Sequence, residues 1–210
     1  MQPYFFPYAG YFRLIAMADL FIFLDDVQFP RTGWVHRNKF ETDTSRFEWI
    51  TLPLVKGERN STKITDLKYR EPEEKLFRQT LIKTKYLSKI PENLINFQNP
   101  VVEDLIRQIK FVSNELGYTP EYMRSSDFPE FRTKSGEEKI VYICKHFGAK
   151  KYLNLNGGKS YYSKEVFERN KIDLEILTPF DGESNSVADL LYAKGPKFVN
   201  SEISKNLVIE

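Results

Sequence analysis

The chain has 210 residues, of which 41% are hydrophobic and 29% charged, and its formal net charge is +2. This composition suits a globular domain with a sizeable core, and a single cysteine excludes an internal disulfide. The 31 basic and 29 acidic residues are mixed along the chain, so no basic patch indicates a nucleic-acid partner. No apolar run is long enough to span a bilayer and no secretory leader is recognisable, so we expect a cytoplasmic protein.

The chain opens with a short α/β succession. Residues 11–18 have the apolar spacing of a helix, and residues 20–24 form a continuous apolar run that is typical of a buried strand. Asp25 and Asp26 follow this run directly. A helix and a strand so close together favour a parallel α/β unit.

The middle of the chain has mainly helical patterns. The pattern at residues 47–55 predicts a strand, and we expect residues 64–69 to pair with a segment close to it. Two helical stretches follow at residues 71–87 and 101–116, and Gly117 stands where a helix ends. We therefore expect one domain over residues 1–210, with a helical insert or layer at roughly 71–117.

The second half returns to an α/β succession. Ser135 and Glu138 have the spacing of a capping box, which predicts a helix up to residue 147, ended by Gly148. After Gly148, the patterns predict a strand, a helix and a strand, at residues 151–155, 163–170 and 172–177. The tail from residue 193 is weakly patterned. We expect an α/β fold whose Rossmann-like, mainly parallel sheet is built from both ends of the chain.

The segment from residue 2 to residue 11 holds two prolines, several aromatic residues and one glycine. Proline fixes the backbone, and glycine permits a tight turn or a close approach. The free N–H groups of the helix that begins next suit an anion such as phosphate. An ordinary turn packed by aromatic rings explains the same residues equally well. The candidate ligand contacts here are Gln2, Tyr4, Tyr8, Gly10 and Tyr11.

Asp25, Asp26 and Gln28 lie at the predicted carboxyl end of a strand, where open α/β sheets bind ligands. Two carboxylates there can orient hydroxyl or amino groups, bind Mg²⁺, or act as acid and base. Adjacent strand residues point to opposite faces, so we expect only one carboxylate to enter a site. The alternative is a solvated turn.

Residues 34–38 add an aromatic ring, a histidine, a guanidinium group and an amide. Arg37 can bind a phosphate or a carboxylate through two parallel hydrogen bonds. Trp34 and Asn38 are further candidate substrate contacts, and His36 is a candidate general base. The alternative is a surface arginine beside a half-buried tryptophan, with a structural histidine.

A glycine-rich loop follows the predicted strand at residues 151–155. Asn156, Gly157, Gly158 and Lys159 are candidate phosphate contacts, although the upstream glycine of a Walker loop is absent and a plain turn is the alternative. Cys144 lies in an apolar segment that indicates a structural thiol. One cysteine and two distant histidines cannot make a zinc site of the usual kind, so we predict no metal site.

Taken together, these motifs resemble the WbqC-like family. That family is associated with gene clusters for bacterial O-antigen, a part of lipopolysaccharide, and for other surface polysaccharides. Its members are described as glycine or acyl transferases acting on amino sugars, and the resemblance implies such a role here. The resemblance is carried by residues 1–15, 18–19, 25–29, Trp34, Arg37 and Asn38, and more weakly by Gly148, Ala149, Tyr152, Leu153, Gly157 and residues 185–191.

The same frame is similar, more distantly, to nucleotidylyl transferases, whose His-x-Gly-His loop stabilises the transferring phosphoryl group. Tyr8 and Tyr11 stand at the two histidine positions here, and tyrosine carries no positive charge near neutral pH. This departure weakens an ATP-dependent interpretation. In such folds an apolar strand precedes the motif, whereas here the motif begins at Met1. We expect a first strand that is short, absent or upstream.

Three functional hypotheses follow. The first is an acyl or aminoacyl transferase that forms an amide on an amino sugar, carried as a nucleotide-linked sugar. Asp25 or Asp26 would be the base, and Tyr11 would stabilise the oxyanion. The second is an ATP-dependent nucleotidylyl-type ligase with another acceptor. The third is a non-catalytic binding module of a polysaccharide assembly complex. The donor is left open between ATP with Mg²⁺ and an acyl thioester.

Overall fold

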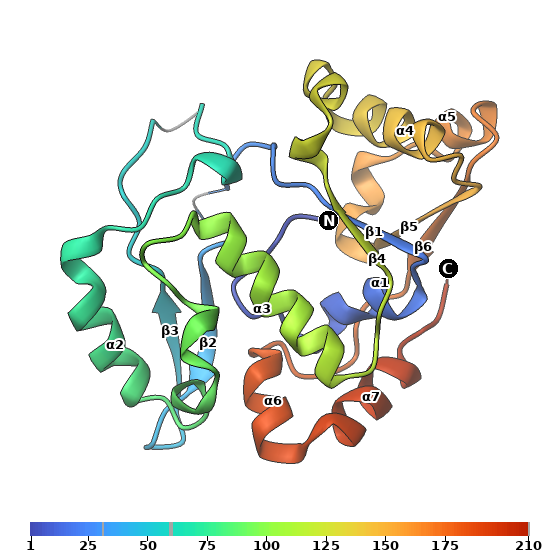
Figure 1. The fold of residues 1–210 in the computed structure, drawn as a ribbon. Coiled ribbons are helices and arrows are strands. Elements are labelled where there is room, and N and C mark those ends of the chain that lie inside the picture. The colour runs from blue at the N-terminus through green and yellow to red at the C-terminus, as the bar shows by residue number, and fades with distance from the viewer. Residues whose placement is uncertain (31, 59–60, 210) are drawn as a thin grey trace.

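The computed structural model describes residues 1–30, 32–58 and 61–209 (Figure 1). Within these residues the strands pair in three two-stranded sheets. β1 (Leu20–Phe23) is parallel to β4 (Glu121–Arg124), and β5 (Lys151–Leu155) is parallel to β6 (Asp173–Leu177). β2 (Arg37–Glu41) and β3 (Phe47–Thr51) form an antiparallel hairpin. The predicted α/β class, with parallel pairing of distant segments, is confirmed.

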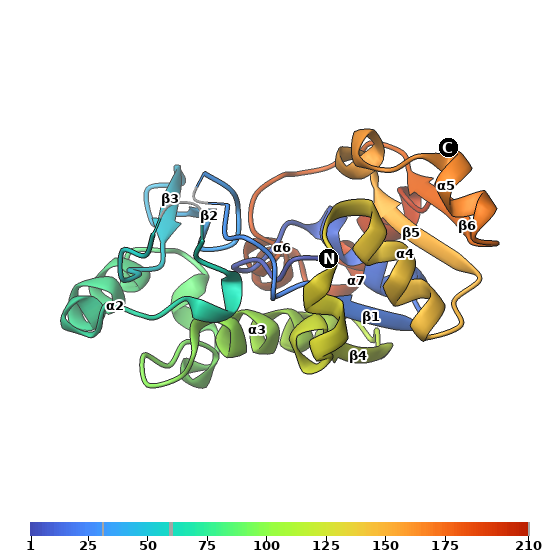
Figure 2. The same ribbon diagram turned by 90° about the horizontal axis from the view of Figure 1, so that it is seen from above.

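The expectation of one shared sheet differs from the observed pairing. β1 and β5 belong to separate pairs, because a cleft lined by side chains from both strands lies between them. Seen from above, the two parallel pairs lie towards one end of the molecule and the β2–β3 hairpin towards the other (Figure 2). The parallel pairs from the two halves of the chain therefore lie side by side, but no continuous ladder of hydrogen bonds joins β1 to β5.

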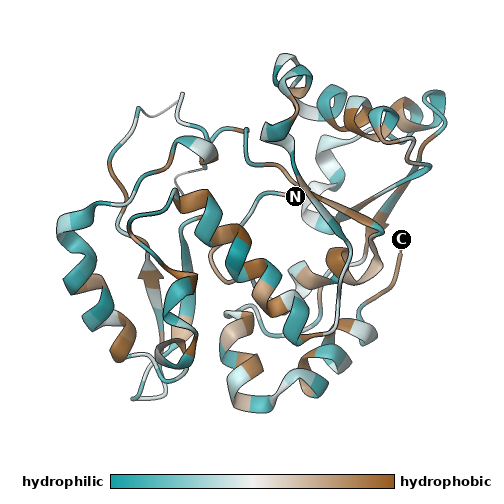
Figure 3. Cartoon of the chain, in the orientation of Figure 1, coloured by the Kyte–Doolittle hydropathy of each residue, from teal (hydrophilic) through white to brown (hydrophobic). Residues whose placement is uncertain are grey.

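Helices cover these pairs on several sides. α3 carries hydrophobic bands between hydrophilic ones (Figure 3), and its apolar residues are buried in the main core. Residues 71–117 contain α2 and α3, and their status as an insert or layer of one domain stays a prediction. The helices are α1 (Phe12–Met17), α2 (Glu74–Ile82), α3 (Val101–Glu115), α4 (Gly136–His146), α5 (Lys164–Arg169), α6 (Val187–Lys194) and α7 (Pro196–Lys205).

Two of the predicted helix ends are confirmed, whereas the predicted capping box is wrong. Gly117 and Gly148 follow α3 and α4 with φ of +80° and +63°, a conformation that glycine adopts without strain. The Ser135 side chain makes no capping hydrogen bond to α4. Glu138 does not reach back to residue 135, because it pairs with Lys134 at 2.5 Å.

The sequence patterns do not predict β2, β4 or α7. β2 and β4 are short and carry polar and charged residues, so they lack the apolar signal of a strand. α7 begins at Pro196, directly after Gly195 with φ of +81°, and buries only Val199 and Ile203. In addition, the predicted strand at residues 64–69 forms a 3-10 turn, Ile64–Asp66, and a single bridge from Tyr69 to Leu54.

The aromatic N-terminal segment is part of the main core. Phe5, Phe6, Tyr11 and Phe12 are fully buried there. A smaller core lies under α4 and α5 and includes Cys144, whose pKa is raised to about 11 by burial. The interpretation of Cys144 as a structural thiol agrees with this position.

Arg13 joins the N-terminal segment to the end of the chain. Its side chain is 1% exposed, and it donates hydrogen bonds to the carbonyl oxygens of Gly10 at 3.2 Å, Thr178 at 2.8 Å and Asn206 at 3.0 Å. A buried guanidinium group needs such partners, because leaving it unpaired is costly. α1, the end of β6 and the end of α7 are thus fixed relative to one another.

Candidate functional site

Residues from other parts of the chain hold the N-terminal segment in place. Phe6 has φ of 39°, and its carbonyl oxygen accepts hydrogen bonds from Asn38 Nδ2 at 2.5 Å and Ser186 Oγ at 3.1 Å. Phe5 N–H donates to Val35 O at 3.0 Å, and Val187 N–H donates to Pro7 O at 2.9 Å. Asn38 is 2% exposed, so its amide stabilises this turn, and we do not keep it as a substrate contact.

Aromatic rings pack closely against Gly10 at the start of α1. A Cβ on Gly10 would lie 2.2 Å from Tyr8 Cε2 and 2.7 Å from Phe180 Cγ, so Gly10 permits this packing, and a phosphate contact there stays a prediction. The Tyr11 hydroxyl donates to Gln2 O at 2.9 Å, and burial raises its pKa well above the usual value. Burial also raises the pKa of Tyr4, to about 12. We therefore do not carry Gly10 or Tyr11 into the proposed site.

Asp25 and Asp26 lie in a network that we call the carboxylate cluster. Asp25 is fully buried, and its Oδ2 accepts from Arg124 Nε at 2.7 Å and Ser126 Oγ at 2.8 Å. Its Oδ1 accepts from the Ser126 backbone N–H at 3.0 Å and from Ser125 Oγ at 3.2 Å. The side chains of the cluster are Asp25, Asp26, Arg124, Ser125, Ser126 and Lys139.

Asp26 has a separate cation. Lys139 Nζ lies 2.5 Å from both Asp26 oxygens, and Ser125 Oγ also donates to Asp26 Oδ1 at 2.5 Å. Burial alone would raise the pKa of Asp26, but the hydrogen bonds from Lys139 and Ser125 and the charge of Lys139 lower it overall. Asp26 is therefore ionised at neutral pH, and both neighbouring carboxylates are in use within the fold.

The cations that pair with the two carboxylates differ in their exposure to solvent. Arg124, which binds Asp25, also pairs with Glu103, and these two side chains are 26% and 41% exposed. Lys139 and Asp26 are 5% and 3% exposed at their side chains. The cation of Asp25 is therefore partly exposed, whereas the cation of Asp26 is buried.

Trp34, Trp49, Arg37 and Lys39 form an aromatic platform on the β2–β3 hairpin. The tryptophan ring centroids are 5.1 Å apart, and the two residues are 41% and 44% exposed. Arg37 Cζ lies 4.8 Å and Lys39 Nζ lies 5.4 Å from the Trp49 ring centroid. Arg37 is positioned by hydrogen bonds from its guanidinium group to Thr32 O and Gly33 O. Exposed rings beside two cations suit a ligand with a flat or pyranose face and negative charge.

His36 lies apart from the carboxylate cluster. Burial and the nearby charge of Arg37 lower its pKa to about 4, so the ring is neutral at pH 7 and a weak base. Its ring packs against Phe29 at 5.0 Å, and its Nδ1 atom is buried with no hydrogen-bond partner among the described residues. His36 lines a cavity of about 340 Å³ together with Arg70 and Lys56. A role for His36 as the base is not part of our proposal.

The remaining candidates lie elsewhere. Gln28 is exposed and forms an isolated bridge with Lys63, and Gln2 is partly buried. The glycine-rich loop forms a 3-10 turn, Asn156–Tyr161, after β5, on the other parallel pair from the cluster. A Cβ on Gly158 would lie 2.4 Å from Asn154 Nδ2, so this glycine permits a tight turn. Phosphate contacts by Asn156, Gly157, Gly158 and Lys159 stay a prediction.

The sequence patterns do not single out Arg124, Ser125, Ser126 or Lys139. Lys139 has a weak signal, since it stands next to Ile140 on the helix face that is otherwise apolar. Arg124 ends a strand that has no clear apolar pattern, so nothing indicates that it reaches Asp25 across 99 residues. Cations that neutralise buried carboxylates can be expected in general, but their positions depend on the tertiary fold.

Asp189 is another buried acid that the patterns do not single out. It is 2% exposed near the start of α6, and its Oδ2 accepts from the Glu41 N–H at 2.7 Å, while its Oδ1 has no partner among the described residues. Burial raises its pKa to about 7, with the hydrogen bond from Glu41 N–H opposing the shift. Burial is thus the main reason why the pKa of this carboxyl group lies near 7.

Comparison with known proteins places this site in a family. The model of the WbqC-like protein family matches residues 2–183, which is most of the chain. The chain belongs to the WbqC-like protein family. The matched range of this chain contains the N-terminal segment, the carboxylate cluster and the aromatic platform. The relation to nucleotidylyl transferases is not confirmed by this match.

One curated relative is a protein of Mycobacterium tuberculosis (strain ATCC 25618 / H37Rv) described as "Uncharacterized protein Rv1507c". It is 25% identical over 182 residues, which cover 82% of this chain and 78% of the relative. No solved structure matches the chain.

In the described part of the chain, no helix has the length and apolar character needed to cross a membrane. The same part of the chain contains no group of three or more His, Cys, Asp or Glu side chains that could hold a metal ion.

The raised pKa of Asp189 predicts a pH dependence of stability. The unfolded carboxyl group ionises near pH 3.8 and the folded one near pH 7, so the folded state binds more protons between these values. The free energy of unfolding should therefore fall from pH 4 to pH 7, by at most about 1.4 kcal/mol per pH unit from this group. Asp189→Asn should remove this component in urea titrations at pH 4, 5.5, 7 and 8.

The exposed Asp43→Asn variant is the matched control and should keep the wild-type slope. An identical slope in wild type and Asp189→Asn would show that Asp189 is ionised in the folded state at neutral pH.

Proposed function

We propose that this protein transfers an acyl or aminoacyl group to the amino group of an amino sugar. The acceptor in this proposal is a nucleotide-linked sugar. The reaction would belong to the cytoplasmic stage of O-antigen or other surface-polysaccharide synthesis. The observation that carries the proposal is the carboxylate cluster, at the carboxyl ends of the neighbouring parallel strands β1 and β4. Ligands bind at this edge in open α/β sheets, and membership of the WbqC-like family supports the substrate class.

Asp25 is the proposed base, because its cation Arg124 is partly exposed and also pairs with the exposed Glu103. The sugar ammonium group would bind between Glu103 and Asp25, taking the place of the Arg124 contact. Asp25 would accept one ammonium proton, since only the neutral amine is a nucleophile. The amine nitrogen then forms a bond to the acyl carbon, and the bond from that carbon to the leaving group breaks. With an acyl thioester, the departing sulfur takes up the second amine proton.

Other cluster residues would support this step without forming covalent bonds to the substrate. Ser125 and Ser126 hold Asp25 in one orientation through three hydrogen bonds at 2.8–3.2 Å. The Arg124 guanidinium group, once displaced from Asp25, is the nearest donor for the developing oxyanion. Lys139 keeps Asp26 ionised and enclosed, so Asp26 is a positioning residue in this proposal.

The aromatic platform is the proposed binding surface for the nucleotide part. A base or sugar ring would stack on Trp34 or Trp49, and Arg37 and Lys39 would bind the diphosphate. Both tryptophans of the chain lie in this platform, so tryptophan emission reports on it alone.

The activity is tested by incubating the protein with nucleotide-linked amino sugars and either glycine with ATP and Mg²⁺ or acetyl thioester, followed by mass spectrometry. We expect a mass gain on the sugar that Asp25→Asn lowers by about 10²-fold or more. Asp43→Asn is the control and should retain full activity. Circular dichroism should show that Asp25→Asn is folded at the assay temperature.

Each other outcome has a definite meaning. AMP formation with a different acceptor would favour an ATP-dependent ligase, and binding without any product would favour a non-catalytic module of an assembly complex. Full activity of Asp25→Asn with the true substrate would show that the base is elsewhere.

Ligand binding is tested separately by tryptophan fluorescence. A UDP-linked amino sugar should quench the emission with a saturable curve, and Arg37→Gln should weaken binding by about tenfold through loss of a charge-assisted hydrogen bond. Arg46→Gln, which alters an exposed arginine between the same two strands, should bind as the wild type. Equal affinities for all three proteins would place the nucleotide outside the platform.

A further inference from the structure

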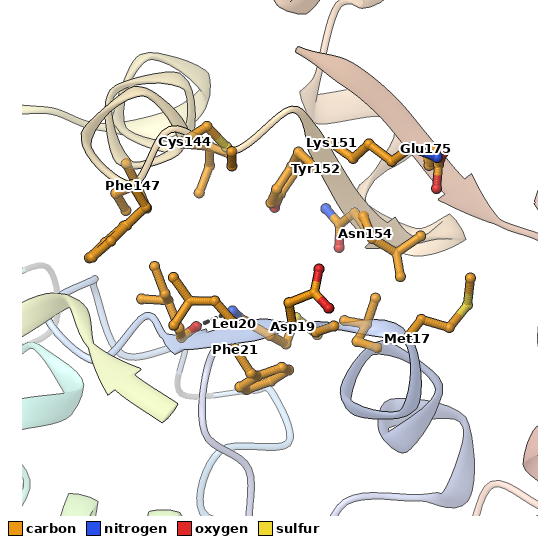
Figure 4. Close-up of a pocket in the computed structure, with 18 of the residues that line it drawn as sticks. Met17, Asp19, Leu20, Phe21, Cys144, Phe147, Lys151, Tyr152, Asn154 and Glu175 are labelled. Atoms are coloured by element: carbon orange, nitrogen blue, oxygen red, sulfur yellow. Dashed lines mark hydrogen bonds and ion pairs between the residues drawn. The ribbon is translucent and has the colours of Figure 1, made fainter. Parts of the chain in front are cut away.

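Two cavities of the molecule differ in the charges that line them. The larger has about 580 Å³ and lies between β1 and β5 (Figure 4), and its lining includes Asp19, Lys151 and Glu175, which carry charges of both signs. The smaller has about 340 Å³ and lies beside the start of β2 and the end of β3, and we call it the hairpin pocket. It shares no lining residue with the larger cavity, the carboxylate cluster or the aromatic platform. The hairpin pocket is therefore a separate feature of the fold.

The charged side chains that line the hairpin pocket are basic. Among the described residues of its lining these are Lys56 and Arg70, and none is acidic. Arg70 donates to Leu54 O at 3.3 Å and pairs with Glu73, which lies outside the lining. Since a guanidinium group has more N–H donors than these two contacts use, Arg70 keeps donors for a further acceptor. The charges of the pocket therefore favour an anion.

His36 adds a polar ring to a lining that is mainly apolar. Burial and the charge of Arg37 lower the pKa of His36, so the ring is neutral at pH 7 and has a single N–H. Its Nδ1 atom is buried with no hydrogen-bond partner among the described residues. A buried N–H without an acceptor is costly, so we place the proton on Nε2, as the donor for a ligand. The apolar residues of the lining are Phe29, Leu52, Pro53, Leu54, Val55 and Leu67.

We propose that the hairpin pocket binds a small carboxylate with an apolar chain, at a site that does not rest on the proposed transfer reaction. The carboxylate binds Arg70 through two N–H groups, with Lys56 as a second positive charge. His36 Nε2–H donates to a carboxylate oxygen, and the chain packs on the apolar lining. A carboxylate fits this lining better than a phosphate dianion, because it has less charge to desolvate. The volume is near the lower end for small-molecule pockets, so a short chain is favoured.

The test uses the two histidines of the chain as reporters. Hexanoate is titrated into the full chain at pH 7, and the imidazole signals are followed by NMR. We expect a saturable shift of the His36 signal and no shift at His146, which lies at the end of α4 near Glu130. Lys56→Gln should weaken hexanoate binding about tenfold, through loss of a charge-assisted contact. Lys68→Gln, which alters an exposed lysine outside the lining, is the matched control and should bind as the wild type.

Hexylamine and inorganic phosphate separate the two parts of the ligand. Hexylamine has the same chain with a positive charge, and phosphate has negative charge without the chain. Each should bind at least about tenfold more weakly than hexanoate. A His36 signal that does not respond to hexanoate would overturn the proposal. Equal affinities for hexanoate and either of the other two probes would also overturn it, as would wild-type affinity of Lys56→Gln for hexanoate.

Discussion

The burial of two neighbouring carboxylates at the end of β1 is the constraint on which the candidate site depends. Asp25 and Asp26 are both almost inaccessible, and a buried carboxylate is tolerated only with hydrogen bonds and a compensating charge. Arg124 reaches Asp25 from the end of β4, and Lys139 reaches Asp26 from the first turn of α4. The site and the packing of α4 over the β1–β4 pair therefore have the same cause.

The N-terminal segment has a different role from the one that its unusual sequence suggests. Its aromatic rings are buried in the main core, Asn38 and Ser186 hold the turn at Phe6, and Arg13 connects the helix that follows to the end of the chain. The segment is therefore fixed by many contacts within the fold. Arg124 and Glu103 are partly exposed at the cluster, and Trp34 and Trp49 are exposed on the hairpin. Of these, Arg124 lies in a strand that has no apolar pattern.

The success of sequence-based prediction followed the strength of the local signals. The helix at residues 101–116, its stop at Gly117, and the strands at residues 20–24 and 151–155 have strong apolar patterns and were predicted within a few residues. β4 has four residues and no such pattern, so the strand that pairs with β1 was missed, and with it Arg124, Ser125 and Ser126. The choice of Asp25 and Asp26 rested on their position after a strand. Their cations could not be predicted, because those contacts span 99 and 113 residues.

The most direct test of this account is a double-mutant cycle on the enclosed pair, with Lys139→Met, Asp26→Asn and the double variant compared by urea unfolding at pH 7. Lys139→Met should lower the free energy of unfolding by about 3–5 kcal/mol, because it leaves a buried charge unpaired, and the second substitution should restore much of this loss. The same cycle on the exposed Lys134–Glu138 pair should give a coupling below about 1 kcal/mol. If the effects of Lys139→Met and Asp26→Asn simply add, the two carboxylates do not depend on separate cations, and the account of the site is wrong.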